Sequence, residues 1–339
     1  KGQNTIGAGS TQACQVWPMD VPTELYHTNW VAERTVEWLK SQDDKDNWFC
    51  WMSFPDPHHP WDVPLSEMER LNWKDVPLPS LYYETDAERR ALLTSKPKHW
   101  LGYYEGSLWT NLESPREFVP AELTPDQVRE INAITHIENE LIDDACGRVL
   151  GWLEERGWMS STDVFFTTDH GELQGDFGLM FKGPYHVDAL MRLPFIWRPA
   201  GGAESATVES PVGHLDLAPT FCEIAGIKTP DYMEGCILPV SDEAAQKQDY
   251  VLTEWDSEHG PVDMHLKSIY RSDGWLCTTY EKSALYQGTE GELYNLTTDP
   301  EQRENLWSKE TRIQRELVEA IYDLLPPARE PRLERRAPV

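Results

Sequence analysis

The chain has 339 residues, 40% of them hydrophobic, and a formal net charge of −28 at pH 7. It is long enough for more than one domain and apolar enough to bury a sizeable core. The strong negative charge argues against nucleic acid and anionic membranes as partners, and no segment approaches the roughly 20 apolar residues of a membrane span.

Six cysteines are scattered through the sequence, and none lies in a C-x-x-C pair: Cys14, Cys50, Cys146, Cys222, Cys236 and Cys277. Several stand in apolar segments such as WFCWMSF, which is typical of buried free thiols. Free thiols persist in reducing compartments, so we expect a cytoplasmic protein.

The first elements predicted along the chain are a helix and a strand. Residues 27–41 (HTNWVAERTVEWLKS) repeat apolar side chains with a helical period, and Thr28 or Asn29 can cap the helix. Residues 46–54 (DNWFCWMSF) form a continuous apolar run, which predicts a short strand buried on both faces. A helix followed by a buried strand is typical of a parallel sheet.

A long irregular region comes next. Residues 55–123 are rich in proline, tryptophan and tyrosine, which predicts a loop region with one helix around residues 85–95. The clearest helix of the chain covers residues 124–157. Thr124 and Gln127 have the spacing of a capping box, a proline follows the cap, and a glycine ends the apolar stripe.

The remaining elements predict two domains. Strands are expected at residues 163–168 and 193–199, and a helix at residues 214–226. After about residue 240 the sequence changes to short strand-like runs (YVLTEW, HLKSIYRS, WLCTTYE) and a final helix. We therefore expect an α/β domain over residues 1–245 and a smaller α+β domain over residues 246–339.

The run VFFTTDHGELQGDFGLMFKG places Asp169 and His170 directly after a predicted strand. In open α/β sheets, ligands bind beyond the carboxyl ends of the strands. Gly171 allows the chain to turn there, so that both side chains can converge. A carboxylate and an imidazole together suit a divalent cation. The alternative is an aspartate that caps the turn beside a histidine that fills space.

Two further residues could bind negative charge. Lys182, downstream of His170, could neutralise an oxyanion or simply lie at the surface. His58, in FPDPHHPWDVP (54–64), is held by prolines and could donate a proton to a leaving group. The alternative is a proline-rich turn with incidental histidines, of which His59 is expected to be an exposed neighbour.

Other candidates have simpler interpretations. His186 could join a second metal, but a surface residue before a helix is the simpler interpretation. His214 and Asp216 are expected to cap a helix, and His136 is expected to pack inside the long helix. The sequence contains no G-x-S-x-G, Walker or H-E-x-x-H motif.

Four segments together resemble the sulfatase branch of the alkaline phosphatase superfamily. TTDHGELQGDFGLMFKG resembles the family's metal-binding strand end with its downstream lysine, and PDPHHPW resembles its P-H-x-P-aromatic segment. HLDLAPTFCEIAGI resembles its V-D-L-x-P-T helix, and GELYNLTTDPEQRENL resembles its terminal E-L-Y-D-L signature. The adjacent Asp and His in TTDHG and the doubled histidine in PDPHHPW most resemble the corresponding segments of phosphonate monoester hydrolases and arylsulfatases.

The resemblance implies a doubly wound mixed sheet of the alkaline phosphatase type with a smaller C-terminal α+β domain. It implies that Asp169 and His170 are metal ligands, and that His58 and Lys182 are catalytic residues that bind substrate oxygens and assist the leaving group. The implied cofactor is one divalent cation, Ca²⁺ or Mn²⁺, with Mg²⁺ as a third option. The implied activity is hydrolysis of a small anionic substrate, a sulfate ester or a phosphonate or phosphate mono- or diester.

The sequence departs from the family pattern in its first part. The family's nucleophile is a formylglycine made from a C/S-x-P/A-x-R motif near the N-terminus, where an acidic pair also binds the metal. Cys14 is followed by QVWP without the arginine, and no strand with an acidic pair precedes residue 40. We therefore expect an N-terminally truncated chain without a nucleophile, inactive alone and prone to aggregate through exposed sheet edges.

Two other functions remain as alternatives to this interpretation, and the chain could also form a homo-oligomer. Phosphomutases and two-zinc phosphatases need further D-x-x-x-H or H-x-x-H ligands, which we do not recognise here. A non-catalytic remnant that kept the fold as a binding module is the other alternative, although the retained site residues argue against it. The aromatic residues of 62–120 could also cover a neighbouring subunit in a homo-oligomer.

Overall fold

The computed structural model describes most of the chain, namely residues 5–45, 47–109, 114–202, 205–241, 248–257 and 263–325. The residues group into two compact units. The first extends to residue 204, except that residues 95–97 belong to the second unit, which continues from residue 205. The boundary between a catalytic and a C-terminal domain near residue 245 stays a prediction, because compactness alone does not assign roles to the units.

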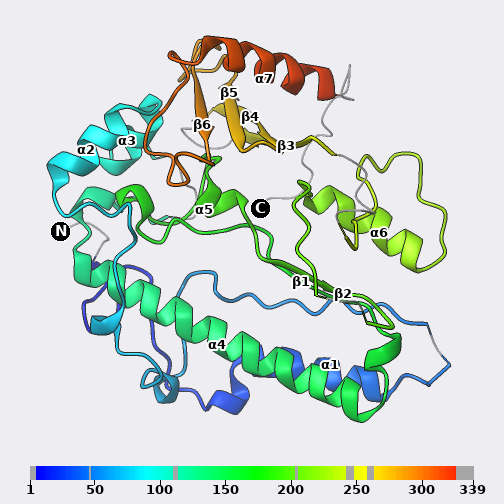
Figure 1. Cartoon of the computed structure of the whole chain (residues 1–339). Helices are drawn as coiled ribbons and strands as arrows, with labels where there is room; N and C mark the ends of the chain where they lie inside the picture. Colours follow the sequence, from blue (N-terminus) through cyan, green and yellow to red (C-terminus); the bar gives the residue numbers. More distant parts are fainter. Residues whose placement is uncertain are drawn as a thin grey trace. The chain divides into compact units, whose positions relative to one another are not determined.

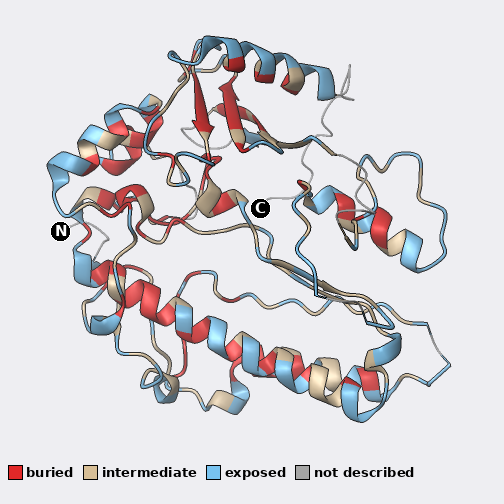
Figure 2. Cartoon of the chain, in the orientation of Figure 1, coloured by how far each residue is buried: buried red, intermediate tan, exposed pale blue. Residues whose placement is uncertain are grey.

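The first unit is built around one long helix. Its helices are, in chain order, α1 (His27–Lys40), α2 (Asp86–Thr94), α3 (Lys98–Tyr104), α4 (Pro125–Glu155) and α5 (Asp188–Met191). α4 packs along α1, and its buried side chains form one stripe of the helix (Figures 1 and 2). The predicted capping box is confirmed, because Thr124 and Gln127 each accept a hydrogen bond from the backbone N–H of the other. Among the helices that the structure describes, none combines the length and the apolarity that crossing a membrane requires.

The region of residues 55–123 holds more structure than we expected. α2 is the helix expected around residues 85–95, but α3 was not predicted. α3 is short, and its aromatic side chains Trp100, Tyr103 and Tyr104 are almost completely buried. Tertiary packing of these rings therefore stabilises a helix that is too short to be stable by itself.

The capping prediction for α1 was wrong. Tyr26 occupies the N-cap position without a side-chain cap, because the polar side chains that follow it have tertiary partners. The Thr28 hydroxyl donates to the carboxylate of Asp56 at 2.5 Å, and the Asn29 amide donates to the carbonyl of Thr23. These longer-range contacts compete successfully with local capping.

The predicted strand at residues 46–54 was also wrong in the part that the structure describes, residues 47–54. No strand is formed there, and burial alternates along the segment. Trp48, Met52 and Phe54 pack on the core of α1 and α4, whereas Phe49 and Trp51 are 62% and 66% exposed. The segment is thus buried on one side, while the side chains on its other side keep most of their surface exposed.

Two predicted strands are confirmed as β1 (Val164–Thr167) and β2 (Phe195–Arg198). They pair antiparallel with Phe165 opposite Trp197, and these two rings stack at 5.0 Å. Phe166 is 44% exposed, so one side of this pair is also uncovered. Parallel bridges at Val16–Trp61 and Met19–Pro64 lie outside this pair. Together with the helices, the pair and the bridges give the unit the mixed α/β character that we predicted.

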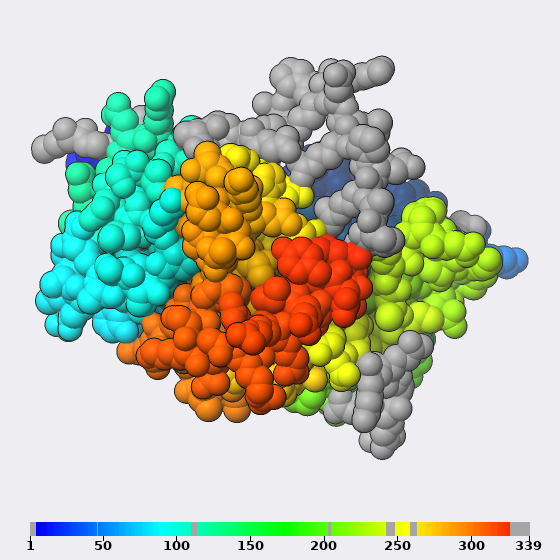
Figure 3. All heavy atoms as spheres, turned by 90° about the horizontal axis from the view of Figure 1, so that it is seen from above, coloured from blue at the N-terminus to red at the C-terminus, as the bar shows by residue number. Residues whose placement is uncertain are grey.

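The second unit is an antiparallel sheet with one covering helix. Its strands follow chain order, β3 (Tyr250–Ser257), β4 (Met264–Arg271), β5 (Trp275–Tyr280) and β6 (Gly291–Asn295), and its helices are α6 (Leu217–Ile224) and α7 (Thr311–Leu324). α7 inserts Leu317 and Ile321 against Ile269 and Leu293 of the sheet. Figure 3 looks onto the outer surface of α7. The strands β3, β4 and β5 and both helices were predicted, whereas β6 was not.

A buried polar network explains why residues 95–97 belong to the second unit. The ammonium group of Lys96 donates to the hydroxyl of Tyr294 and to the carbonyl of Gln302, each at 2.8 Å. Glu292 accepts hydrogen bonds from the hydroxyls of Tyr280 and Tyr294. Burial lowers the pKa of Lys96 to about 8, although the nearby carboxylate of Glu292 works in the opposite direction.

All six cysteines are free, as predicted. Cys14 and Cys277 are buried, and the other four are partly exposed, so the expectation of buried thiols is correct for two of them. The reducing, cytoplasmic location stays a prediction.

The uncovered side of residues 47–54 leads to a first prediction. Replacing Phe49 and Trp51 together by serine should reduce aggregation, measured by light scattering, without lowering the melting temperature, since both rings are already exposed. The matched control is Trp61→Ser, which removes a fully buried ring and should cost about 3–5 kcal/mol. Unchanged aggregation of the double variant would contradict the prediction.

Candidate active site

Asp169 and His170 lie in the turn that follows β1, and their side chains face each other. His170 Nε2 is 3.6 Å from Asp169 Oδ2. His170 Nδ1 lies 2.8 Å from the carbonyl oxygen of Gly171, and because a carbonyl can only accept, Nδ1 carries the proton. The lone pair of the neutral ring is then on Nε2, the nitrogen that faces the carboxylate.

The carboxylate of Asp169 is held in its charged form. Its oxygen Oδ1 accepts hydrogen bonds from the backbone N–H of His170 at 3.0 Å and from the hydroxyl of Thr168 at 3.3 Å. Desolvation acts to raise the pKa of Asp169, although the side chain is 85% exposed; the charge that the imidazole of His170 carries when protonated and these hydrogen bonds outweigh it and hold the pKa below its usual value. A charged carboxylate beside an oriented imidazole nitrogen is a donor set that fits a divalent cation.

Lys182 is not a surface residue. Its side chain is only 12% exposed, and Nζ lies 3.7 Å from Oε2 of Glu172. The backbone around it is unusual, because Phe181 has a φ of 66°. The structure thus excludes the alternative of a lysine at the surface and places an ammonium group within the first unit, beside the segment that carries Asp169 and His170.

His58 and His59 differ in burial, and the structure contradicts the burial that we expected for His59. His58 is exposed, whereas His59 is 7% exposed, so the prediction of an exposed His59 was wrong. The two rings stack at 4.3 Å, and Nδ1 of His58 lies 2.5 Å from the carbonyl oxygen of His59. Nδ1 is therefore the donor, and Nε2 of the neutral ring can accept a proton or a hydrogen bond.

Three segments that carry the predicted site residues are joined by contacts. The ring of His59 lies 4.7 Å from that of Phe181, the residue before Lys182. The N–H of Leu173 donates to the carbonyl of Phe181 at 3.1 Å, which ties the Asp169 segment to the same loop. The first unit therefore brings the three segments together, while the roles of the four residues stay predictions.

The other histidines correct two expectations. His186 is 5% exposed and was wrongly expected at the surface, and burial lowers its pKa to about 4. His136 was expected to pack but is exposed on α4. Asp216 occupies the N-cap position of α6, but its side chain does not cap that helix. Its carboxylate instead accepts from the N–H groups of Gly213 at 2.9 Å, just before the short 3-10 turn that leads into α6, and of Cys236 at 2.7 Å.

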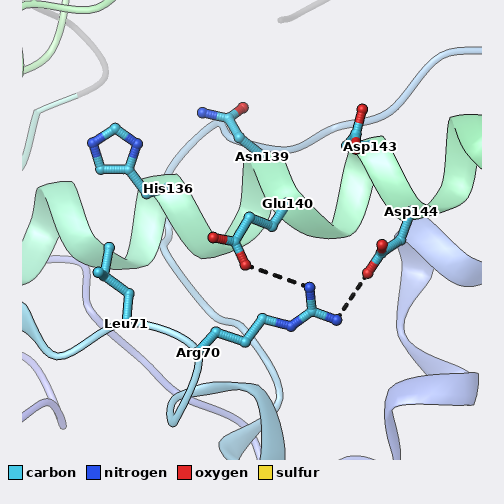
Figure 4. Close-up of a pocket in the computed structure, with 7 residues that line it drawn as sticks. All are labelled: Arg70, Leu71, His136, Asn139, Glu140, Asp143 and Asp144. Carbon is cyan, nitrogen blue, oxygen red and sulfur yellow. Dashed lines mark hydrogen bonds and ion pairs between the residues drawn. The ribbon is translucent and has the colours of Figure 1, made fainter.

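A groove along α4 does not contain the predicted site. Arg70 reaches across it to Glu140 at 3.4 Å and Asp144 at 2.8 Å (Figure 4). His136, Asn139 and other α4 side chains complete its open, acidic wall. Because its arginine is paired with carboxylates and its walls are acidic, the groove is a poor binding surface for an anionic ester.

Sequence reasoning missed one group of titratable residues. His27, Asp56 and Asp62 place their donor atoms within 4.8 Å of one another. The available signal was a pair of aspartates on either side of the doubled histidine, in the segment PDPHHPWD. The third member, His27, comes from the start of α1 and could not be associated with them from the sequence alone.

Comparison with known families gives the chain its classification. The model of the family described as Sulfatase matches residues 3–227. The chain belongs to the sulfatase family. A second family model, N-sulphoglucosamine sulphohydrolase, C-terminal, matches residues 175–326 of the chain. Both matches confirm the resemblance to the sulfatase branch of the alkaline phosphatase superfamily.

The curated relatives are considerably longer than this chain. It is 27% identical over 309 residues to an uncharacterized sulfatase, YidJ, of Escherichia coli, covering 89% of the chain and 56% of the relative. It is 26% identical to an arylsulfatase of Clostridium perfringens, covering 91% of the chain and 60% of the relative. The chain thus spans somewhat more than half of the length of these relatives.

Solved structures confirm the predicted fold class. The phosphonate monoester hydrolase of Agrobacterium radiobacter is similar with a TM-score of 0.72 at 21% identity, covering 91% of this chain and 62% of that structure. The phosphonate monoester hydrolase of Silicibacter pomeroyi has a TM-score of 0.72 at 18% identity, covering 96% of this chain and 66% of that structure. These similarities establish an alkaline-phosphatase-like α/β fold.

The buried His186 predicts a loss of stability in acid. Its pKa is about 4 in the folded protein but 6.5 in an ordinary environment, so the unfolded chain takes up a proton first as the pH falls. The free energy of unfolding should therefore be unaffected above pH 6.5 and should fall by about 2 kcal/mol from this residue between pH 7 and pH 4.5.

Urea unfolding of His186→Asn at both pH values tests this prediction. The variant should lose that part of the pH dependence, whereas His136→Asn, which changes an exposed histidine on α4, should retain it. An identical pH dependence in both variants would show that His186 titrates normally in the folded protein.

Proposed function

We propose that a polypeptide containing this chain is a metal-dependent hydrolase of sulfate esters, or of phosphonate or phosphate mono- and diesters. The proposal rests mainly on one observation, the oriented Asp169–His170 pair at the end of β1 in a chain of the sulfatase family. The names of the relatives support the same class, since they include an arylsulfatase and phosphonate monoester hydrolases.

Asp169 and His170 are the residues proposed to hold the cation. A bound divalent ion would supply positive charge to the oxygens of an anionic ester. The chemistry of the donors supports Ca²⁺, Mn²⁺ or Mg²⁺, because a carboxylate is present together with an imidazole whose Nδ1 is held by a carbonyl oxygen, which leaves Nε2 as the nitrogen that can bind an ion. Two donors do not complete a coordination sphere, so further ligands would have to come from residues outside this pair.

Lys182 and His58 are proposed to act on the substrate itself. Lys182 is largely buried, and a point charge in a partly dry environment binds an anionic oxygen more strongly than it does in water. His58 is exposed and has its Nδ1 fixed by the carbonyl of His59, so Nε2 is oriented for proton exchange with a leaving group.

The nucleophile is proposed to lie outside this chain. Cys14 stands earliest among the cysteines, yet it is 1% exposed and burial raises the pKa of its thiol to about 12. It lacks the arginine of the family's formylglycine motif as well. We therefore propose that the isolated chain does not turn over, and that a small anionic ester is the substrate only of the longer polypeptide.

Activity assays test the proposal. The chain alone should hydrolyse neither 4-nitrophenyl sulfate nor 4-nitrophenyl phenylphosphonate. A polypeptide in which a sulfatase-family N-terminal segment with its C-x-P-x-R motif precedes residue 5 should hydrolyse at least one of them. In that polypeptide His170→Asn should reduce kcat/KM by about 100-fold or more, because metal affinity depends on the imidazole.

Two controls make the assay decisive. Asp143→Asn changes an exposed aspartate of α4 and should leave hydrolysis unchanged. Lys182→Met should lower kcat/KM without releasing the metal, which separates substrate binding from metal binding. A folded, metal-loaded polypeptide that hydrolyses none of the sulfate, phosphate and phosphonate esters would favour the non-catalytic remnant instead.

A further inference from the structure

A second group of metal-type donors lies in the first unit and shares no residue with the Asp169–His170 pair. His27 is the first residue of α1, Asp56 and Asp62 flank the loop that carries His58, and Glu138 lies on α4. We call these four residues, His27, Asp56, Asp62 and Glu138, the acidic cluster. They come from three segments of the chain, so the fold itself assembles them.

Three members of the acidic cluster are close enough to share one ion. His27 Nε2 lies 2.6 Å from Asp56 Oδ1, and one donor atom from each of His27, Asp56 and Asp62 lies within 4.8 Å of the others. Two ligands on opposite sides of an ion, with bonds of about 2.0–2.2 Å, are about 4.4 Å apart at most. Ligation would require the hydrogen bond between His27 and Asp56 to open from 2.6 Å to about 3.0–3.4 Å, the separation of two neighbouring ligands of one ion, and only small shifts elsewhere.

Glu138 adds a second observation, a buried carboxylate oxygen beside the cluster that has no hydrogen-bond partner among the described residues. Its side chain is completely buried, and Oε1 accepts from the backbone N–H of Asp62 at 3.3 Å. Among the residues that the structure describes, no group donates a hydrogen bond to its other oxygen, Oε2. A buried carboxylate oxygen without a partner is costly unless a proton or a cation satisfies it.

The charges of the acidic cluster do not balance. Burial raises the pKa of Glu138 well above its usual value, and the carboxylates of Asp56 and Asp62 raise it further. Burial likewise raises the pKa of Asp62, and Asp56 adds to the effect, although His27 opposes it. His27 is the only basic member, so three carboxylates face at most one positive charge.

We infer that the acidic cluster binds one divalent transition-metal ion, Zn²⁺ or Mn²⁺, through the imidazole of His27 and the carboxylates of Asp56 and Asp62, with the carboxylate of Glu138 beside these ligands. One nitrogen donor with carboxylate oxygens suits these two ions better than it suits Ca²⁺, which prefers oxygen ligands only. The ion would neutralise the excess negative charge of the cluster, to which Glu138 contributes. It also fixes both ends of the loop that carries His58.

Metal titration of the purified chain, stripped with EDTA, tests the inference without any activity assay. Asp169→Asn/His170→Asn removes the other candidate ligands and should still bind one equivalent of Zn²⁺ or Mn²⁺, with Ca²⁺ binding at least tenfold more weakly. In that background, His27→Gln or Asp62→Asn should weaken binding by at least about tenfold, measured by isothermal titration calorimetry. Circular dichroism in EDTA checks that each variant is folded.

Glu138→Gln is the second variant and keeps the inference testable if the others do not fold. Glutamine has nearly the same shape but no charge, so in EDTA the variant should melt at the same or a higher temperature than the parent. On addition of Zn²⁺ or Mn²⁺ the parent should gain more in melting temperature than the variant. Loss of binding on Asp169→Asn/His170→Asn alone, the absence of stoichiometric binding, or equal metal-induced shifts with and without Glu138 would each overturn the inference.

Discussion

The packing of Phe181 sets the positions of the residues on which the proposed chemistry depends. Its ring lies 4.7 Å from that of His59 and stacks on Trp61 at 5.8 Å. A φ of 66° is unfavourable for a residue with a large side chain and costs roughly 1–3 kcal/mol. Complete burial of the ring contributes a similar amount in the opposite direction. Because Lys182 follows Phe181 and His58 precedes His59, one aromatic contact orients two segments that are far apart in the sequence.

The loop that carries His58 is also held from its other side. The N–H of Trp61 donates to the carbonyl of Gln15, and the N–H of Trp17 donates to the carbonyl of Trp61, each at 2.8 Å. Asp56, at the beginning of the loop, accepts from the hydroxyl of Thr28 on α1. A loop fixed by aromatic packing, backbone pairing and side-chain hydrogen bonds can hold a side chain such as His58 in place much as a regular element would. This explains how an exposed histidine can still be well oriented.

Elements with strong local signals could be predicted from the sequence, whereas burial could not. The capping box of Thr124 and the apolar stripe after it predicted α4, and the run before Asp169 predicted β1. The burial of His186 and the exposure of His136 were both predicted wrongly, because burial depends on which distant segment covers a residue. For the same reason the acidic cluster was missed, since its histidine and its aspartates belong to separate segments.

The failed strand prediction has a different physical origin. The apolar run of residues 47–54 carries large side chains at alternating positions on both sides, which is the pattern of a strand covered on both faces. In the described residues only one side is covered, and Phe49 and Trp51 are left exposed, as Phe166 is on β1. Relatives with the same fold are considerably longer than this chain. The pattern of this segment therefore predicted how apolar its two sides are, but not whether a neighbouring segment covers both of them.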